Sequence, residues 1–319
     1  MKQRSKQPAR PPSDKNVTAE QPFHPELRGA RFLPRTIINA RTLSTLRVLT
    51  KLTGRGRRLD AQVVSVDADV SVHVFRPPSP RPRTPALLWI HGGGMVLGDA
   101  AQDSDFCRRI ADQLGIVVVS VEYRLAPEHP FPTPLDDCYT ALRWLARQPD
   151  IDPARIAIGG ESAGGGLAAA LALLARERGE IHPVLQMLSY PMLDDRTTTR
   201  TDINPRRLRI WSPASNRFGW RSYLGPATAG GNVPPLAAPA RYEDLAGLPP
   251  AWIGVGTNDL FHDEDVTYAH RLQQAGVATT LHVVPGAYHN FDSIQAKAAV
   301  SRTFLEARTA ALDKALNRG

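Results

Sequence analysis

Short apolar runs alternate with longer segments of helical periodicity along most of the chain beyond residue 60. The continuous runs are Ala86–Ile90, Ile116–Val121, Ile156–Ile158, Val184–Leu188, Trp252–Val255 and Leu281–Val284. Runs of this kind predict the strands of a parallel sheet that is buried on both faces, with helices between them. Residues 61–66 and 70–76 instead predict an antiparallel hairpin. The plainest helix is expected from Ser162 to Arg178, because this segment is rich in Ala and is followed by Gly179.

Three regions depart from this alternation. Residues 1–22 are polar and without periodicity, so we expect a disordered basic arm there. In residues 26–52 apolar positions recur at spacings of three and four and are interrupted by Pro34, which predicts two short amphipathic helices. Packing of these helices on the body is favoured over a membrane surface, because their apolar face is short for an interfacial anchor. Residues 193–248 are long for a plain loop and predict a lid or cap.

The distribution of charge changes what the composition implies. The 319 residues carry a formal net charge of +8 and a pI near 9.8, which by themselves favour a nucleic-acid partner. However, residues 1–60 hold 14 of the 39 Lys and Arg but only four of the 31 Asp and Glu, a local charge of +10. The other 259 residues therefore carry −2. Because the basic excess belongs to one segment without a recognised binding module, we expect no nucleic-acid partner.

Composition also narrows the protein class and its location. With 42% hydrophobic residues the chain can bury a large core, and no apolar run approaches the ~18–20 residues of a membrane span. We therefore expect no stable membrane insertion. No apolar segment of the secretory type follows the basic start, so a cytoplasmic location is expected. Cys107 and Cys138 are too few for a disulfide scaffold and form no paired metal motif.

The strongest chemical motif is Gly160-Glu161-Ser162-Ala163-Gly164, which follows the predicted strand 156–158 and opens a helix. A sharp turn between strand and helix exposes a serine hydroxyl above the edge of the sheet, and small flanking residues relieve crowding there. The alternatives are a packing turn rich in glycine or a phosphate loop. The phosphate-loop pattern GxxxxGK[ST] is absent, so the context favours a nucleophilic serine.

A second motif, His91-Gly92-Gly93-Gly94, ends the predicted strand 86–90. Consecutive glycines allow backbone N–H groups to turn toward an oxyanion, which a β-carbon would obstruct. Three glycines alone are more typical of a flexible loop. Their position upstream of the serine turn, in the order expected for an oxyanion hole, favours the functional interpretation.

A serine nucleophile needs a histidine base, which a carboxylate holds in one tautomer. The histidines after the serine are His182, His262, His270, His282 and His289. Of these, His289 stands in a loop just past the predicted strand 281–284, where a reactive side chain can reach the sheet edge. Asp259 follows the strand 252–255 in the same way, and the order serine, acid, histidine is the one expected.

The acidic residues that follow Asp259 have a simpler explanation. Asp263, Glu264 and Asp265 are expected in the first turn of the next helix, where they complement its dipole. Together with His262 they could suggest a metal site, but no companion ligand has suitable spacing, and helix capping explains them. We expect no metal.

These motifs resemble the hormone-sensitive-lipase-like group of esterases (bacterial family IV) in the α/β-hydrolase superfamily. The resemblance rests on the two glycine motifs above and on Tyr123-Arg124-Leu125-Ala126-Pro127-Glu128, Asp259-Leu260-Phe261-His262-Asp263-Glu264 and Pro285-Gly286-Ala287-Tyr288-His289-Asn290-Phe291. It implies an α/β-hydrolase fold with a mostly parallel eight-stranded sheet flanked by helices, and a helical cap. That cap is built from the N-terminal segment and the insertion that follows Tyr190.

The resemblance also implies roles for individual residues. Ser162 is the nucleophile, His289 the base and Asp259 the group that orients it. The oxyanion hole comes from the backbone of Gly93, Gly94 and Ala163, and no cofactor is required. One residue departs from the family pattern: Glu161 stands where Asp is more usual, which leaves the nucleophile intact and alters the contacts behind it.

The expected activity is hydrolysis of short to medium acyl esters through an acyl-enzyme. The alternatives are an amide deacylase or deacetylase of a small metabolite on the same residues, and a catalytically inactive ligand receptor, which the complete triad disfavours. Candidates for the substrate pocket, each equally compatible with plain core packing, are Met95, Val96, Tyr190, Trp211, Phe218, Trp220, Leu260 and Phe291.

The expected organisation has three parts: the basic arm 1–22, N-terminal cap helices in 23–60, and a catalytic domain 61–319 with the cap insertion near 193–248. The expected partner is a small-molecule ester. The sequence is also compatible with a homodimer.

Overall fold

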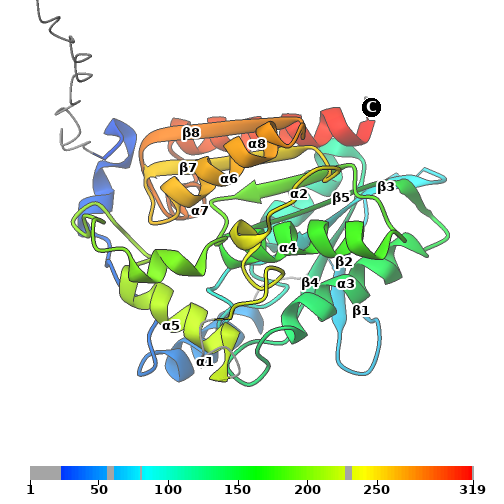
Figure 1. The fold of residues 1–319 in the computed structure, drawn as a ribbon. Coiled ribbons are helices and arrows are strands. Elements are labelled where there is room, and N and C mark those ends of the chain that lie inside the picture. The colour runs from blue at the N-terminus through cyan, green and yellow to red at the C-terminus, as the bar shows by residue number, and fades with distance from the viewer. Residues whose placement is uncertain (1–22, 56–60, 80, 227–231, 318–319) are drawn as a thin grey trace, which may run out of the picture.

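The structure, a computed structural model, describes residues 23–55, 61–79, 81–226 and 232–317 (Figure 1). The expected disordered arm, residues 1–22, lies outside the described residues, and so do residues 56–60 of the expected N-terminal cap helices.

Eight strands form a single sheet in the order β1-β2-β4-β3-β5-β6-β7-β8. Strands β1 and β2 pair antiparallel, β2 also pairs antiparallel with β4, and the remaining pairs are parallel. The strands are β1 (Gln62–Ser65), β2 (Ser71–Phe75), β3 (Thr84–Ile90), β4 (Val117–Glu122), β5 (Ile151–Glu161), β6 (Leu185–Ser189), β7 (Ala251–Asn258) and β8 (Thr279–Tyr288). The predicted mostly parallel eight-stranded sheet and its hairpin are therefore confirmed.

Both faces of the sheet are covered because its strands alternate apolar side chains between two cores. Leu88 and Ile90 of β3 contribute to one core, and Leu87 and Trp89 to the other. Helices α3 (Thr133–Ala146), α4 (Ala163–Arg178) and α6 (His262–Gln274) pack with the first core, and α2 (Ser104–Leu114) and α8 (Ala299–Asn317) with the second (Figure 1). Each fully buried aliphatic side chain stabilises the fold by about 1.5–3 kcal/mol.

Strand register brings four sequence motifs to one edge of the sheet. Asn258 at the end of β7 pairs with Tyr288 at the end of β8, so the residues that follow them, Asp259 and His289, emerge side by side. Ile90 at the end of β3 pairs with Gly160 near the end of β5. The motif that starts at His91 therefore begins next to the serine turn. Parallel pairing is what allows these distant segments to meet, since all the strand ends point the same way.

The N-terminal segment forms two helical pieces, as predicted: η1 (Pro25–Phe32) and α1 (Leu43–Arg55). The first is a 3-10 helix that ends two residues before Pro34. The region after β6 holds η2 (Asp195–Thr199), α5 (Pro213–Leu224) and η4 (Pro239–Arg241), and the short α7 (Phe291–Ile294) follows β8. None of the described helices is both long and apolar enough to cross a bilayer.

These two regions are distant in sequence but are joined by hydrogen bonds between residues 30–38 and residues 209–215. The hydroxyl of Thr36 donates to Ser212 Oγ at 2.9 Å, and the hydroxyl of Ser215 donates to the carbonyl of Ile38 at 2.9 Å. Further bonds run from the N–H of Ile210 to the carbonyl of Pro34 at 2.9 Å and from the Arg209 guanidinium to the carbonyl of Ala30 at 2.7 Å.

Candidate active site

Ser162 occupies a strained turn between β5 and α4. Its φ of 54° and ψ of −119° lie in a region that residues other than glycine rarely adopt. A β-carbon at Gly160 would stand 2.4 Å from the carbonyl oxygen of Gly164, and one at Gly164 would stand 2.0 Å from that of Ile90. Both flanking glycines are therefore required by the close approach of backbone at this turn. The N–H of Ser162 donates to the carbonyl of Ser189 at 2.9 Å, which fixes the turn to β6.

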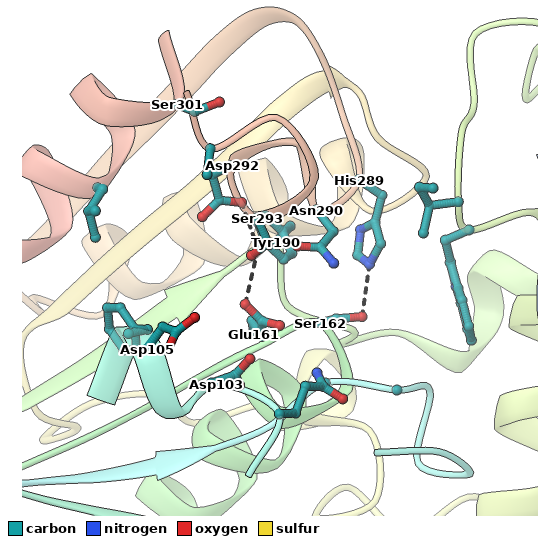
Figure 2. A pocket seen from close by; sticks show the side chains of 18 of the residues that line it. Asp103, Asp105, Glu161, Ser162, Tyr190, His289, Asn290, Asp292, Ser293 and Ser301 are labelled. Carbon is teal, nitrogen blue, oxygen red and sulfur yellow. Dashed lines mark hydrogen bonds between the residues drawn. The ribbon is translucent and has the colours of Figure 1, made fainter. Parts of the chain in front are cut away.

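A chain of hydrogen bonds connects Ser162, His289 and Asp259. The distance from His289 Nε2 to Ser162 Oγ is 2.9 Å (Figure 2), and that from His289 Nδ1 to Asp259 Oδ2 is 2.8 Å. The other oxygen of Asp259 accepts the N–H of Phe261 at 3.0 Å. All members of the chain are buried, with relative exposures of 7%, 4% and 6% in the order named. The structure thus brings together the three side chains that the sequence predicts.

Aromatic rings hold the imidazole of His289 in place. Tyr190 and Phe261 contact it edge to face, with centroids 5.0 and 5.3 Å away, and Trp211 lies at 6.3 Å. Asn290, the next residue, adopts a left-handed conformation with φ 61°. The ring therefore has little freedom to leave the line between serine and carboxylate.

The loop after β3 has positive φ at Gly93, Gly94 and Met95, with values of 119°, 64° and 67°. A β-carbon at Gly93 would stand 1.8 Å from the carbonyl oxygen of Leu97, and one at Gly94 would stand 2.2 Å from the Trp211 ring. Within the described residues, the N–H groups of Gly93 and Gly94 donate to no other protein group. Ala163 is the first residue of α4, where an N–H has no partner inside the helix.

His91 anchors the start of this loop. Its Nδ1–H donates to the carbonyl of Gly92 at 2.7 Å, and its ring stacks on Tyr123 with centroids 4.3 Å apart. The hydroxyl of Tyr123 in turn donates to the carbonyl of His91 at 3.0 Å. Burial lowers the pKa of His91 to about 4, so the ring is neutral at pH 7. His91 therefore supports the backbone of the loop and is no base for the serine.

A cavity of about 480 Å³ opens beside Ser162. Its apolar lining residues include Ile37, Ile38, Leu97, Ile210 and Trp211. The other lining residues include charged groups, namely the carboxyl groups of Asp103, Asp105, Glu161 and Asp292 (Figure 2) and the guanidinium groups of Arg109, Arg302 and Arg308. The cavity therefore presents both apolar and charged groups to a bound ester.

Glu161 is one of the charged lining residues and makes the contacts behind the serine. The hydroxyl of Tyr190 lies 3.2 Å from Glu161 Oε2 and 2.8 Å from Asp292 Oδ1 (Figure 2), and Arg308 pairs with Asp292 at 3.3 Å. Burial, together with the charges of Asp103 and Asp292, raises the pKa of Glu161 well above its ordinary value. The longer carboxylate at this position thus joins a buried polar network that also reaches the loop of His289.

The eight pocket candidates divide unevenly. Tyr190 and Trp211 line the cavity at Ser162. The others are not among its lining residues and pack in the cores instead: Met95, Val96, Trp220, Leu260 and Phe291 are buried, and Phe218 is partly buried. Sequence reasoning missed Asp103, Asp292 and Arg308, which come from separate segments and carry no motif. Ile37 and Ile38 could have been found, because they belong to the apolar pattern of the predicted N-terminal helices.

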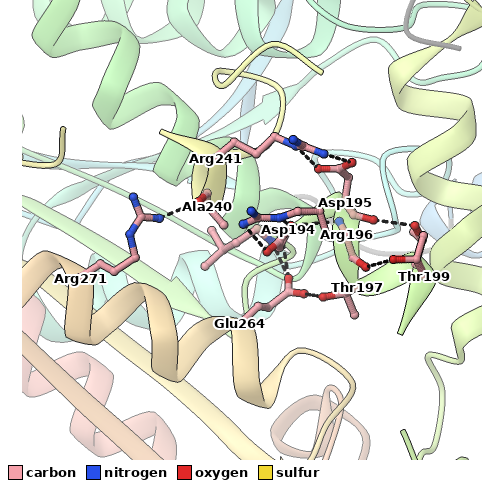
Figure 3. A network of polar contacts seen from close by, with 11 residues as sticks. Asp194, Asp195, Arg196, Thr197, Thr199, Ala240, Arg241, Glu264 and Arg271 are labelled. Atoms are coloured by element: carbon pink, nitrogen blue, oxygen red, sulfur yellow. Dashed lines mark hydrogen bonds and ion pairs between the residues drawn. The ribbon is translucent and has the colours of Figure 1, made fainter. Parts of the chain in front are cut away.

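The acidic residues after Asp259 lie in a helical first turn as predicted, and Glu264 makes further contacts that the sequence did not indicate. Asp263, Glu264 and Asp265 do lie in the first turn of α6, but Glu264 and Asp265 are buried. Glu264 accepts the N–H groups of Leu193 and Asp194 at 2.8 and 3.1 Å and the hydroxyl of Thr197 (Figure 3). It therefore connects α6 to the first residues after β6. Among the described residues, no cluster of His, Cys, Asp or Glu is arranged to hold a metal ion.

A mostly parallel eight-stranded sheet with a serine at a strained strand-to-helix turn defines the class of α/β hydrolases. Comparison with protein families agrees, since the α/β hydrolase fold family matches residues 87–293. The chain belongs to this family and, within it, to the hormone-sensitive-lipase-like esterases, as its motifs predict. It is a carboxylic ester hydrolase.

Individual relatives are similar over most of their length. A carboxylesterase of Mycobacterium tuberculosis, NlhH, is 36% identical over 247 residues, which are 73% of this chain and 75% of the relative. An ethyl acetate hydrolase of Pseudomonas putida is 37% identical over 237 residues, 69% of this chain and 70% of the relative. Among solved structures, a bacterial heroin esterase superposes with a TM-score of 0.84 and 36% identity, over 92% of this chain and 98% of that one.

Proposed function

We propose that Ser162 attacks the ester carbonyl while His289 removes its proton and Asp259 holds the imidazole in the reactive tautomer. The observation that carries this proposal is the hydrogen-bonded chain of 2.9 and 2.8 Å that ends on a serine in a strained turn. An unperturbed hydroxyl is a poor nucleophile, and a base within hydrogen-bond reach activates it. The alcohol then leaves with the proton from His289, and water removes the acyl group from Ser162 by the same route.

The tetrahedral intermediate is proposed to rest on the N–H groups of Gly93, Gly94 and Ala163. Support comes from the positive φ values of the two glycines and from the position of Ala163 at the start of α4. Donors that are already oriented toward the developing charge stabilise it without reorganisation during the reaction. No metal is needed for this step.

The proposed substrates are esters with short to medium acyl chains. The apolar lining of the cavity can take a hydrocarbon chain, and a total volume near 480 Å³ suits a small molecule. The ethyl acetate hydrolase among the relatives supports an ester of small size. An amide deacylase or deacetylase remains the second candidate, since acyl-transfer residues do not by themselves select the leaving group.

The domain organisation is part of this proposal. We propose that the described parts of the N-terminal segment 23–60 and of the insertion 193–248 form a cap over the catalytic domain, residues 56–60 and 227–231 lying outside the described residues. Both contribute to the cavity, through Ile37 and Ile38 on one side and Ile210 and Trp211 on the other. The hydrogen bonds between the two segments support a single covering layer.

The test is the variant Ser162→Ala with p-nitrophenyl esters of two to twelve acyl carbons and the matching anilides. The variant should lose at least about 10⁴-fold in kcat/KM while keeping the wild-type circular dichroism and Tm. Ser44→Ala, which changes an exposed serine on α1, serves as the control and should behave as wild type. Turnover by Ser162→Ala at the wild-type rate would contradict the proposal, and faster hydrolysis of anilides than of esters would favour the amide alternative.

A further inference from the structure

Arg47 lies on α1 and directs its guanidinium away from its own helix, toward two other segments. Its Nε donates to the carbonyl of Val96 at 2.8 Å, and its Nη2 donates to the carbonyl of Ala126 at 2.7 Å. Its Nη1 and Nη2 also meet both carboxylate oxygens of Glu128, at 2.7 and 3.1 Å. One side chain of the N-terminal segment thus joins the loop after β3 to the segment after β4.

The loop that Arg47 contacts is the one proposed to bind the oxyanion. Val96 follows directly after Gly93, Gly94 and Met95, whose φ values are all positive. For Met95 this conformation is strained, and strained backbone persists only where its surroundings restrain it. On the far side of the loop, the N–H of Ala126 donates to the carbonyl of Met95 at 2.9 Å and Arg47 donates to the carbonyl of Val96. These bonds add to those within the loop, where the N–H of Leu97 donates to the carbonyl of Gly93 at 3.0 Å.

The two carbonyl bonds matter more than the ion pair with Glu128. Val96 and Ala126 are fully buried, so water does not readily reach their carbonyl oxygens. The guanidinium of Arg47 donates the hydrogen bonds that these buried carbonyls need. The carboxylate of Glu128 is more than half exposed, with a relative side-chain exposure of 56%, and exposed ion pairs contribute little. The guanidinium suits this position because its planar fork reaches several acceptors at once, which an ammonium group cannot do.

We propose that Arg47 is a positioning residue for the oxyanion loop, so that α1 is needed for the chemical step and is more than a cover for the substrate. The inference rests on the proposed function, because it assumes that Gly93 and Gly94 stabilise the oxyanion. Without Arg47 the buried carbonyls of Val96 and Ala126 have to find water or move. Either change displaces the N–H groups of the glycines from the position that the transition state requires.

The experiment compares Arg47→Ala, Arg47→Lys, Glu128→Gln and the control Arg41→Ala, which alters an exposed arginine of the same segment. Each variant is measured for kcat and KM with p-nitrophenyl butyrate. Each is also measured for the Ki of a trifluoromethyl ketone, which forms a tetrahedral oxyanion with the serine, and for the Ki of the matching trifluoromethyl alcohol, which does not. Thermal unfolding of each variant separates structural loss from catalytic loss.

Arg47→Ala should lower kcat about 10-fold and raise the Ki of the ketone by a similar factor, with KM and the Ki of the alcohol within about 2-fold of wild type. This loss is smaller than the ~10²–10³-fold expected when an oxyanion donor is removed outright, because the donors are displaced and not deleted. Arg47→Lys should recover only part of the loss, and Glu128→Gln and Arg41→Ala should stay within about 2-fold of wild type.

Several results would overturn the inference. A rise in KM with unchanged kcat would make α1 a cover only, and a lower Tm with unchanged kcat and ketone Ki would make Arg47 merely structural. Equal losses in Glu128→Gln and Arg47→Ala would assign the effect to the ion pair. If Arg47→Ala does not fold, Arg47→Lys decides, because it keeps the charge but removes Nε. A wild-type enzyme that the ketone does not inhibit would instead refute the proposed function itself.

Discussion

The two halves of the proposed catalytic machinery are held in different ways. Ser162, Asp259 and His289 follow directly from the ends of β5, β7 and β8, and the strand register sets their positions. The oxyanion loop, Gly93–Leu97, begins at β3 but then leaves the sheet with three consecutive positive φ values. Its far side is bonded to Arg47 of α1 and to Ala126. The strand ends thus set the positions of the three side chains, whereas the loop also makes hydrogen bonds to a distant segment of the chain.

The largest expected effect tests the half that the sheet supports. Asp259→Asn should lower kcat/KM by about 10⁴-fold, because an amide at this position favours the wrong imidazole tautomer. Folding should be little changed, since the side chain remains the same size and can still accept the N–H of Phe261. The measurement is steady-state kinetics together with thermal unfolding. Asp263→Asn, which alters an exposed carboxylate four residues later, should leave kcat/KM within about 2-fold, and an equal loss there would remove the special role of Asp259.

The next effect tests the oxyanion loop. Gly93→Ala should lower kcat by about 10²–10³-fold, since a β-carbon 1.8 Å from the Leu97 carbonyl oxygen forces this donor out of place. Gly276→Ala is the matched control, because Gly276 also has positive φ, 79°, but has nothing within 4 Å of an added β-carbon. This control should lose stability without losing kcat. If both variants show the same kcat, the conformation of the loop does not determine the rate.

A third effect concerns the stability contributed by Glu264, which joins α6 to the segment after β6. Glu264→Ala should lower the free energy of unfolding by about 2–4 kcal/mol, because the N–H groups of Leu193 and Asp194 lose their buried acceptor. Glu264→Gln retains an acceptor and should lose less. Denaturant unfolding of both variants measures the difference. Equal losses would mean that the packing of the side chain, and not its hydrogen bonds, holds the segment after β6.

The smallest effect is a pH dependence of the free energy of unfolding, and it arises from His91 at the start of the oxyanion loop. The pKa of His91 is about 4 when folded and 6.5 in its ordinary state, so the folded protein binds fewer protons between these values. The stability that His91 contributes is present above pH 6.5 and is lost as the pH falls toward 4, by about 2 kcal/mol at pH 5. Burial also lowers the pKa values of His73 and His282, which act in the same direction.

The contribution of His91 is isolated by comparing wild type with His91→Gln. The variant should have a shallower decline of unfolding free energy between pH 7 and pH 5, measured by urea titration at each pH. A parallel decline in the two proteins would show that His91 does not titrate as its burial requires.

The motifs of the chain were sufficient to predict most of the residues that the strand ends position. Ser162 between two glycines, Asp259 after one strand and His289 after another are local patterns, and an apolar run followed by a polar loop identifies a strand end. The same patterns predicted the sheet and its hairpin. They did not distinguish among the pocket candidates, of which Tyr190 and Trp211 line the cavity beside Ser162 and six pack in the cores. An aromatic residue has the same appearance in sequence whether it faces a substrate or a neighbouring helix.

The chain by itself determined the order of strands and helices, the turn that exposes Ser162 and the loop that requires Gly93 and Gly94, because these depend on local sterics and periodicity. The tertiary structure decided which distant residues support them. The placement of Arg47 against Val96, of Glu264 against Leu193 and of Asp103 and Asp292 around Glu161 joins segments far apart in sequence. No local pattern encodes such contacts. They depend on where whole segments pack on the sheet and on which buried backbone groups then need a hydrogen-bond partner from elsewhere in the chain.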